Sequence, residues 1–297
     1  MKLRFKPMND QNDALFMRKF KSNIMVKLNL ILLLILPGVL AWNKAEAQIL
    51  VGPVVGTHIG WASYDDIDLK DFYDVSPTFG FHAGGSIAFR VQKRFFLQTS
   101  IMYTQKEKKI SGGGDGMFSN SLRNRYIDVP ILYTAEFKAR LGKDKVYKWY
   151  LGVGPNVSYW LGGSGSLRNS DLDENLIEEL NYKVTFGSTE EIGEREMNVA
   201  EPNRLQLGLN ISAGLIFEPM GIHKFMLTTR YEHGHSFLSR ESNGVYGLPG
   251  TLYYEDELKV RNNAFVVSLY YFIDLKIEER KKGKSTSKIK TGKRRRR

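Results

Sequence analysis

The sequence predicts an all-β protein, an eight-stranded antiparallel up-and-down transmembrane β-barrel with a filled lumen. Three observations predict this fold. Apolar and polar residues alternate with a period of two along much of the chain after residue 47, the connections between these segments are short and long by turns, and aromatic residues gather near both ends of the segments. A β-strand with one apolar face has this period, and a membrane barrel has these connections and aromatic girdles.

The first 47 residues predict an export signal that is removed. Basic residues precede an apolar run from Leu28 to Trp42, which is shorter than the roughly 20 residues that a membrane-spanning helix needs. The small-x-small pattern Ala45 to Ala47 follows, as at a signal-peptidase site. We therefore expect the mature chain to begin at Gln48, with Met17 and Met25 as alternative translation starts.

Eight β-strands are expected in the mature part. The clearest runs from Leu205 to Phe217, where apolar residues take the odd positions and Gln, Gly, Asn and Ser take the even ones. The eight expected strands cover residues 49–62, 78–91, 95–106, 127–137, 149–161, 205–217, 224–237 and 262–275.

The connections favour a barrel over a secreted β-sandwich, which would also alternate. Links after the second, fourth and sixth strands are short, whereas the long polar links are 64–77, 107–124, 162–203 and 238–260. Periplasmic turns and extracellular loops produce this regular alternation. The longest link, 162–203, has 10 acidic and 3 basic residues, and we expect a solvated, partly disordered loop there, or a site for cations or protein partners.

Two aromatic girdles are expected on the apolar face when both termini are placed in the periplasm. One set of aromatic residues lies toward the turns and the other lies toward the loops, as at the two interfaces of a bilayer. The turn-side set is Phe89, Phe137, Trp149, Phe217, Phe225 and Tyr271, and the loop-side set is Trp61, Phe79, Tyr103 and Tyr159.

The inward face predicts a closed lumen, because eight strands leave an interior that side chains can fill. Glycines alternate there with charged residues, and buried charges need partners. We expect a lumen charge network made by Arg90, Asp128, Glu136, Arg230 and Glu232. A narrow gated conduit through the same residues is the alternative.

The formal net charge of +11 is unevenly distributed. Residues 1–47 carry +5 (8 basic, 3 acidic), the expected barrel 48–279 carries −5 (24 basic, 29 acidic), and the tail 280–297 carries +11 (11 basic, none acidic). We expect a disordered periplasmic tail with no dedicated partner; the alternative is that Arg294, Arg295, Arg296 and Arg297 contact anionic headgroups, an acidic envelope partner or the cell wall. Export to the envelope excludes nucleic acid as a partner.

Enzyme chemistry finds little support in the residues. The absence of cysteine excludes thiolate nucleophiles, thiolate zinc sites and iron–sulfur clusters. Glu232 to Ser236 (EHGHS) is the best catalytic candidate, but Ser236 adjoins His235 and so points to the opposite face of the strand. His233 and His235 share a face without an identifiable third metal ligand. We expect no enzyme activity, no cofactor and no metal.

Three strands carry a family resemblance. Tyr126 to Lys138 (YIDVPILYTAEFK), Trp149 to Gly163 (WYLGVGPNVSYWLGG) and Leu205 to Phe217 resemble the small outer-membrane barrels common in Bacteroidota, grouped as PorT-like or OmpA/OmpX-like. The resemblance implies an outer-membrane protein in contact with lipid and lipopolysaccharide, with a structural or protein-interaction role. One group of such barrels implies the alternative, an accessory of type IX secretion or of outer-membrane assembly. A lipid-A-modifying enzyme is a weaker alternative.

Overall fold

The computed structural model describes residues 48–66, 71, 73–92, 94–112, 118–141, 145–170, 172, 178–187, 192–219, 222–239, 243–247 and 253–275. The expected signal segment 1–47, with Met17 and Met25, lies outside these residues, as does the basic tail 280–297 with Arg294 to Arg297. None of the helical residues in the described part belongs to a helix long and apolar enough to cross a membrane.

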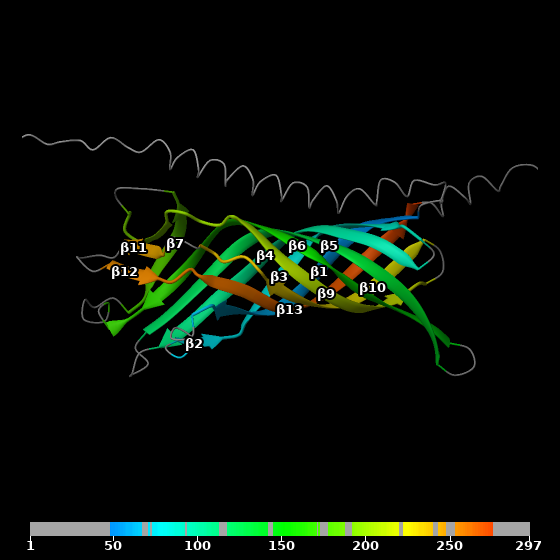
Figure 1. Ribbon diagram of the computed structural model, residues 1–297, viewed down its shortest axis with the longest axis horizontal. Helices are drawn as coiled ribbons and strands as arrows, with labels where there is room; N and C mark the ends of the chain where they lie inside the picture. Colours follow the sequence, from blue (N-terminus) through cyan, green and yellow to red (C-terminus); the bar gives the residue numbers. More distant parts are fainter. Residues whose placement is uncertain are drawn as a thin grey trace, which may run out of the picture. The chain divides into compact units, whose positions relative to one another are not determined.

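Eight antiparallel strands form a closed ring of backbone hydrogen bonds (Figure 1). Around the ring the strands are β1 (Ile49–Tyr64), β3 (Thr78–Arg90), β4 (Phe95–Gly112), β5 (Phe118–Leu141), β6 (Lys145–Arg168), β9 (Leu205–Phe217), β10 (His223–Gly234) and β13 (Val260–Asp274). The last strand pairs with the first from Leu50↔Asp274 to Tyr64↔Val260, which closes the ring. The predicted fold, an eight-stranded antiparallel barrel, is confirmed.

Three strands extend further than predicted. β4 continues to Gly112, β5 begins at Phe118, and their pairing runs to Gly112↔Phe118, so much of the predicted loop 107–124 is paired strand. β6 likewise continues to Arg168. Polar residues face outward along these extensions, and this composition resembles a loop because that part of the strand has no apolar outer face.

Five short strands lie beyond the ring at the end opposite the short turns, which we call the loop end; the other is the turn end. These strands are β2 (Tyr73–Ser76), β7 (Leu180–Phe186), β8 (Glu196–Val199), β11 (Gly244–Gly247) and β12 (Tyr253–Asp256), and Figure 1 shows β2, β7, β11 and β12 there. β7 pairs with β8 in parallel, and the sheet continues through β11 to β12. The expectation of a solvated loop at 162–203 is therefore wrong for β7 and β8.

The loop-end strands enclose an apolar core. Its buried members come from the ring, from β7, β8 and β11, and from the segments beside them, and Tyr73 and Val75 of β2 pack against it, so the two parts pack as one body. They are Ala62, Tyr64, Ile110, Leu122, Tyr126, Trp160, Leu167, Leu172, Leu180, Tyr182, Met197, Val199, Leu238, Tyr246, Leu258 and Val260. Burial of these side chains explains why acidic composition alone did not predict order in this region.

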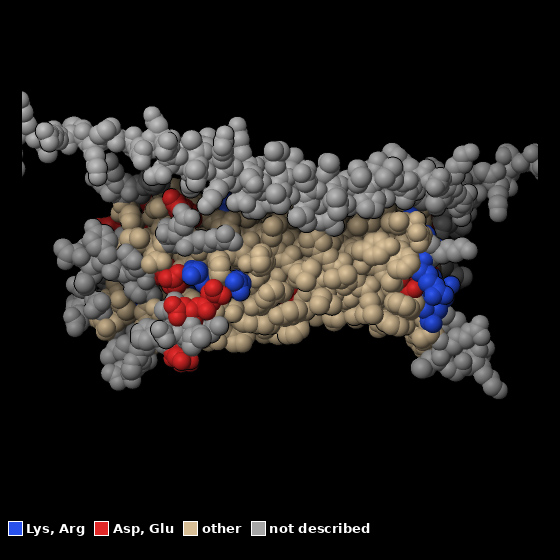
Figure 2. Space-filling model, viewed as in Figure 1, with Lys and Arg blue, Asp and Glu red and all other residues tan. Residues whose placement is uncertain are grey.

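The outer face of the ring is apolar. Figure 2 shows charged side chains near both ends of the barrel and very few between them on the visible face. The exposed apolar side chains include Val55, Phe79, Phe81, Ile101, Leu151, Val153, Leu205, Leu209, Ile211, Phe265, Val267 and Leu269. Exposure of this many apolar side chains suits a hydrocarbon environment and not water.

Adjacent glycines of β3 face opposite sides of the wall and give a matched test of ring closure. A Cβ at Gly84 would overlap the carbonyl oxygen of Ile101, whereas a Cβ at Gly85 meets no heavy atom within 4 Å. We expect Gly84→Ala to cost about 1–3 kcal/mol of barrel stability because strands must shift, and Gly85→Ala to be near neutral. The measurement is the temperature at which half of the fast-migrating folded band is lost in gel electrophoresis. Equal midpoint temperatures for the two variants would contradict the close approach.

Candidate functional site

The middle of the lumen holds a buried lysine between two carboxylates. Lys106 of β4 lies 3.1 Å from Asp128 of β5 and 2.5 Å from Glu232 of β10, measured between Nζ and the nearest carboxylate oxygen. Each of these side chains is less than a tenth exposed. β4 and β5 are neighbours in the ring, and β10 lies across the ring from β4, so inward side chains of these strands meet across the narrow interior.

Arg230 completes this group, which we call the central charge layer: Lys106, Asp128, Arg230 and Glu232. The Arg230 guanidinium lies 3.9 Å from Glu232, and Asn156 donates a hydrogen bond to the same carboxylate at 3.2 Å. Two cations and two carboxylates give the layer no net charge. Such an arrangement offsets the cost of burying ions, and it leaves no surplus carboxylate for acid–base work.

Two buried histidines, His58 and His82, lie beside this layer. The rings of His58 and His82 are stacked with centroids 6.2 Å apart, and Nε2 of His82 is 2.8 Å from Oγ of Ser268. Both side chains are buried. In the described part of the chain, no group of three or more His, Asp or Glu side chains has the arrangement of a metal site.

An apolar layer lies on the turn side of the central charge layer. Along β10 the inward residues are Lys224, Met226, Thr228, Arg230 and Glu232, so apolar Met226 separates the charges of the middle from the lysine at the end. The other buried members of the apolar layer are Leu50, Val54, Ala88, Phe96, Met102, Tyr150, Tyr270 and Phe272. Together with the loop-end core, this layer closes the lumen on both sides of the central charges.

A second set of charges occupies the turn end. Lys148 pairs with Glu136 at 3.8 Å and also with Glu218, and Lys224 bridges Glu218 at 3.2 Å and Asp274 at 3.8 Å. Burial alone would raise the pKa of Glu218, but the hydrogen bond from Lys148 and the charge of Lys224 outweigh burial and hold this pKa below its ordinary value.

The five residues predicted as one lumen network thus fall into two groups. Asp128, Arg230 and Glu232 meet in the central layer, whereas Arg90 pairs with Glu136 at the turn end, where Nη2 and Oε2 are 3.9 Å apart. Sequence reasoning missed Lys106, the cation that joins Asp128 to Glu232. Lys106 continues the alternate positions of Met102 and Thr104, which face the lumen, and this pattern could have indicated that it also points inward. The polar residues that follow it resemble the start of a loop.

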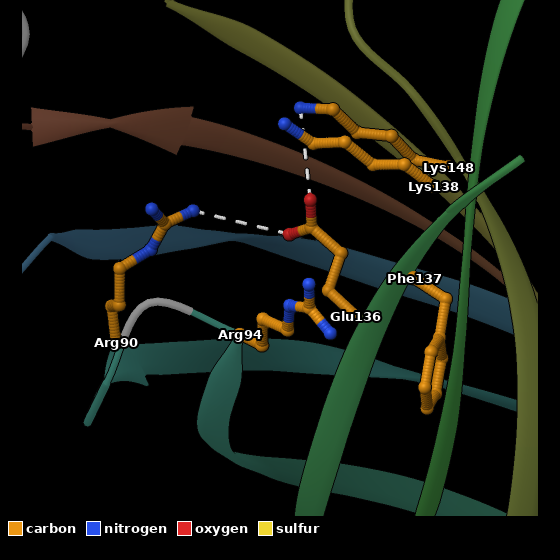
Figure 3. A pocket seen from close by; sticks show the side chains of 6 residues that line it. All are labelled: Arg90, Arg94, Glu136, Phe137, Lys138 and Lys148. Carbon is orange, nitrogen blue, oxygen red and sulfur yellow. Dashed lines mark ion pairs between the residues drawn. The ribbon is translucent and has the colours of Figure 1, made fainter.

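A cavity of about 400 Å³ opens beside the turn-end charges. Figure 3 shows the side chains around it: Arg90, Arg94, Glu136, Phe137, Lys138 and Lys148. Arg90 and Lys148 approach Glu136 from two sides. The cavity is therefore lined mainly by cations.

A further buried ion pair ties the loop-end strands to the ring. Nζ of Lys108 in β4 lies 2.6 Å from both carboxylate oxygens of Asp256 in β12, and both side chains are almost completely buried. Asn120 of β5 donates to Tyr246 of β11 at 2.9 Å and accepts from Tyr182 of β7 at 2.7 Å. These contacts depend on pairings between distant segments, so the sequence pattern could not predict them.

The EHGHS segment lies at the loop-side end of β10. His233 and His235 are exposed, and Nδ1 of His233 is 2.9 Å from Oδ1 of Asn263. Ser236 accepts a hydrogen bond from the backbone N–H of Leu207 at 2.9 Å. The serine hydroxyl thus faces a neighbouring strand instead of a histidine.

Comparison with known proteins agrees with this geometry. The domain family described as "Outer membrane protein beta-barrel domain" matches residues 43–236, which is more than half of the chain. The chain belongs to this family. Membership places the protein in the outer membrane and agrees with the ring of eight strands and its apolar outer face.

The solved structures to which this chain is similar include three bacterial surface or outer-membrane proteins. Neisserial surface protein A is 11% identical over 78% of this chain and 100% of its own, with a TM-score of 0.34. OprG from Pseudomonas aeruginosa is 10% identical over 78% and 97%, with a TM-score of 0.40, and Ail of Yersinia pestis is 10% identical over 75% and 98%, with a TM-score of 0.31. Among curated proteins no significant match is found.

The central charge layer predicts a large effect for loss of its lysine. Lys106→Met should lower the free energy of unfolding by about 3–5 kcal/mol, because Asp128 and Glu232 would remain buried without their shared cation. Arg123→Gln is the control: it breaks an ion pair with Glu107 whose arginine is 60% exposed, and it should cost about 1 kcal/mol or less. The urea concentration at which half of the folded gel band is lost measures the stability of both variants. If both variants lowered this concentration by the same small amount, the result would argue against a tightly coupled layer.

The lowered pKa of Glu218 predicts acid sensitivity at the turn end. A carboxylate whose pKa is lower in the folded state stabilises that state above its unfolded pKa, here near the ordinary value of 4.5, and loses this contribution as the pH falls further. Glu218→Gln should therefore be less stable than the parent at neutral pH, and the difference should shrink below about pH 4. Heat midpoints across this range test the prediction, and a difference independent of pH would contradict it.

Proposed function

We propose that this outer-membrane barrel is a non-enzymatic envelope protein that holds a folded interaction surface outside the membrane. The observation that carries the proposal is the loop end: β2, β7, β8 and β11 pack with the ring strands in one apolar core, and the ion pair of Lys108 with Asp256 fastens β12 to the ring. A solvated loop would lose conformational entropy on binding, whereas a preformed surface has already lost it.

A groove on the loop-end strands suits a polar partner. Its volume is about 730 Å³, and its lining comes from β5, β6, β7 and the segment leading into β8. Small residues of β6, among them Ser164, Gly165 and Ser166, form part of the lining, with Arg123, Asn181 and Lys183 beside them. This composition supplies hydrogen-bond donors and acceptors, so we assign the groove to an envelope protein partner.

The filled lumen supports a role that does not depend on transport. Two apolar layers flank the central charges, and the charges are paired with each other. This packing weighs against the narrow conduit. The outer apolar face contacts lipid and, at the loop end, lipopolysaccharide.

The proposed orientation places both chain ends in the periplasm. Gln48 hydrogen-bonds Asp274 at the turn end, so the start and the end of the ring lie together there. Short turns at the periplasmic face and longer extracellular segments are the usual arrangement of such barrels.

A role in type IX secretion or outer-membrane assembly is the second candidate. The PorT-like resemblance and the basic tail favour it, and so does the β5–β6 hairpin. This hairpin pairs from Lys138↔Lys148 to Leu141↔Lys145, beyond the last pairings of the neighbouring strands at Phe95↔Ala135 and Lys148↔Ile216. It offers a periplasmic contact surface that a purely structural barrel does not need.

Site-specific photo-crosslinking in intact cells tests both candidates. A photoreactive residue at Asn181 or Lys183, both exposed on β7, should give a discrete protein crosslink, and Ile101 in the apolar belt is the lipid-facing control. Crosslinks at Tyr147 on the projecting hairpin, without any at β7, would support the secretion or assembly role instead. Absence of specific crosslinks at all of these positions would contradict an interaction role.

A further inference from the structure

The cavity at the turn end gathers positive charge from two separate turns. Arg90 and Arg94 flank the turn between β3 and β4, and Lys138 and Lys148 lie on the β5–β6 hairpin. We propose that this pocket is a binding site for a phosphate-class anion, either free phosphate or the headgroup of an anionic phospholipid.

The charges of the pocket do not balance. Four cations surround one carboxylate, Glu136, which accepts only long ion pairs: 3.9 Å from Arg90 and 3.8 Å from Lys148. Lys148 has a second partner in Glu218, but within the described residues neither Arg94 nor Lys138 forms an ion pair with a carboxylate. Even with Glu136 and Glu218 both counted, the group keeps an excess of positive charge.

The backbone fixes the relative position of the two turns. The N–H of Glu136 donates a hydrogen bond of 2.7 Å to the carbonyl of Arg94, which ties the β3–β4 turn to β5. Figure 3 shows Arg90 and Arg94 to the left of Glu136 and the side chains of the two lysines above its carboxylate. Guanidinium and ammonium groups converging on one space are the donors that bind phosphate oxygens best.

The pocket also lies at the depth of lipid headgroups. Each of its cations is next in sequence to an aromatic residue: Phe89 precedes Arg90, Phe95 follows Arg94, Phe137 precedes Lys138, and Trp149 follows Lys148. The Phe137 and Trp149 rings stack with centroids 4.6 Å apart. Aromatic girdles mark the interface of a bilayer, so a cation one residue beyond them is within reach of a lipid phosphate as well as of the periplasm.

Calorimetric titration with inorganic phosphate is the first test. The full-length protein is purified in a neutral detergent and a phosphate-free buffer. It is compared with the pocket double variant Arg94→Gln/Lys138→Gln and with Glu136→Gln. The charge-matched control is Arg168→Gln/Lys259→Gln, at exposed positions of the loop end. The pocket double variant should bind about tenfold more weakly than the parent, and the control should equal the parent. Glu136→Gln should bind more tightly, because it removes the one carboxylate that competes with the anion.

Mixed micelles with phosphatidylglycerol or phosphatidylcholine separate the two sources. Binding of phosphatidylglycerol, lost in the pocket double variant while inorganic phosphate gives no signal, would support the site and assign it to the headgroup. Binding of inorganic phosphate would assign it to the free anion. Two outcomes would overturn the proposal: no binding of either ligand, or equal binding by the parent and the pocket double variant.

Discussion

The structure depends on one constraint: in hydrocarbon, every backbone N–H and C=O must find a partner within the protein. The antiparallel pairing of β1 with β13 meets this requirement for the two strands that would otherwise be edges. Closure with eight strands also fixes the width of the interior. Side chains then fill the lumen, so each charge that points inward needs a partner across a distance that the ring itself has set.

The lumen meets this demand by separating its charges into layers. The central layer is neutral and lies between two apolar cores, whereas the turn-end charges include the partly exposed side chains of Arg90, Lys148 and Glu218. Lys108 and Asp256 likewise form a buried ion pair, at the loop end. Stability and closure of the lumen are thus two results of the same packing, and the surface functions are left to the two ends of the barrel.

All eight ring strands could be predicted from the sequence because lipid on one side and a small lumen on the other impose a period of two. The prediction failed where lipid ends. Glu107 and Lys109 face outward on β4 above the apolar belt, so the polar run around them resembled a loop and hid the inward Lys106 and Lys108. The partners Glu232 and Asp256 lie 126 and 148 residues away from these lysines, a separation that no local pattern encodes.

The seam between the first and last ring strands has a kinetic consequence. Its outermost pair, Leu50↔Asp274, joins opposite ends of the folded chain, whereas the β5–β6 hairpin pairs residues that are close in sequence, such as Leu141↔Lys145. Contacts of high sequence separation form slowly because the intervening chain must first be ordered. Until the seam closes, β1 and β13 each have an unpaired edge, and unpaired edges invite association with other chains. The interval before closure is therefore the period in which this protein gains most from a factor that covers these two edges.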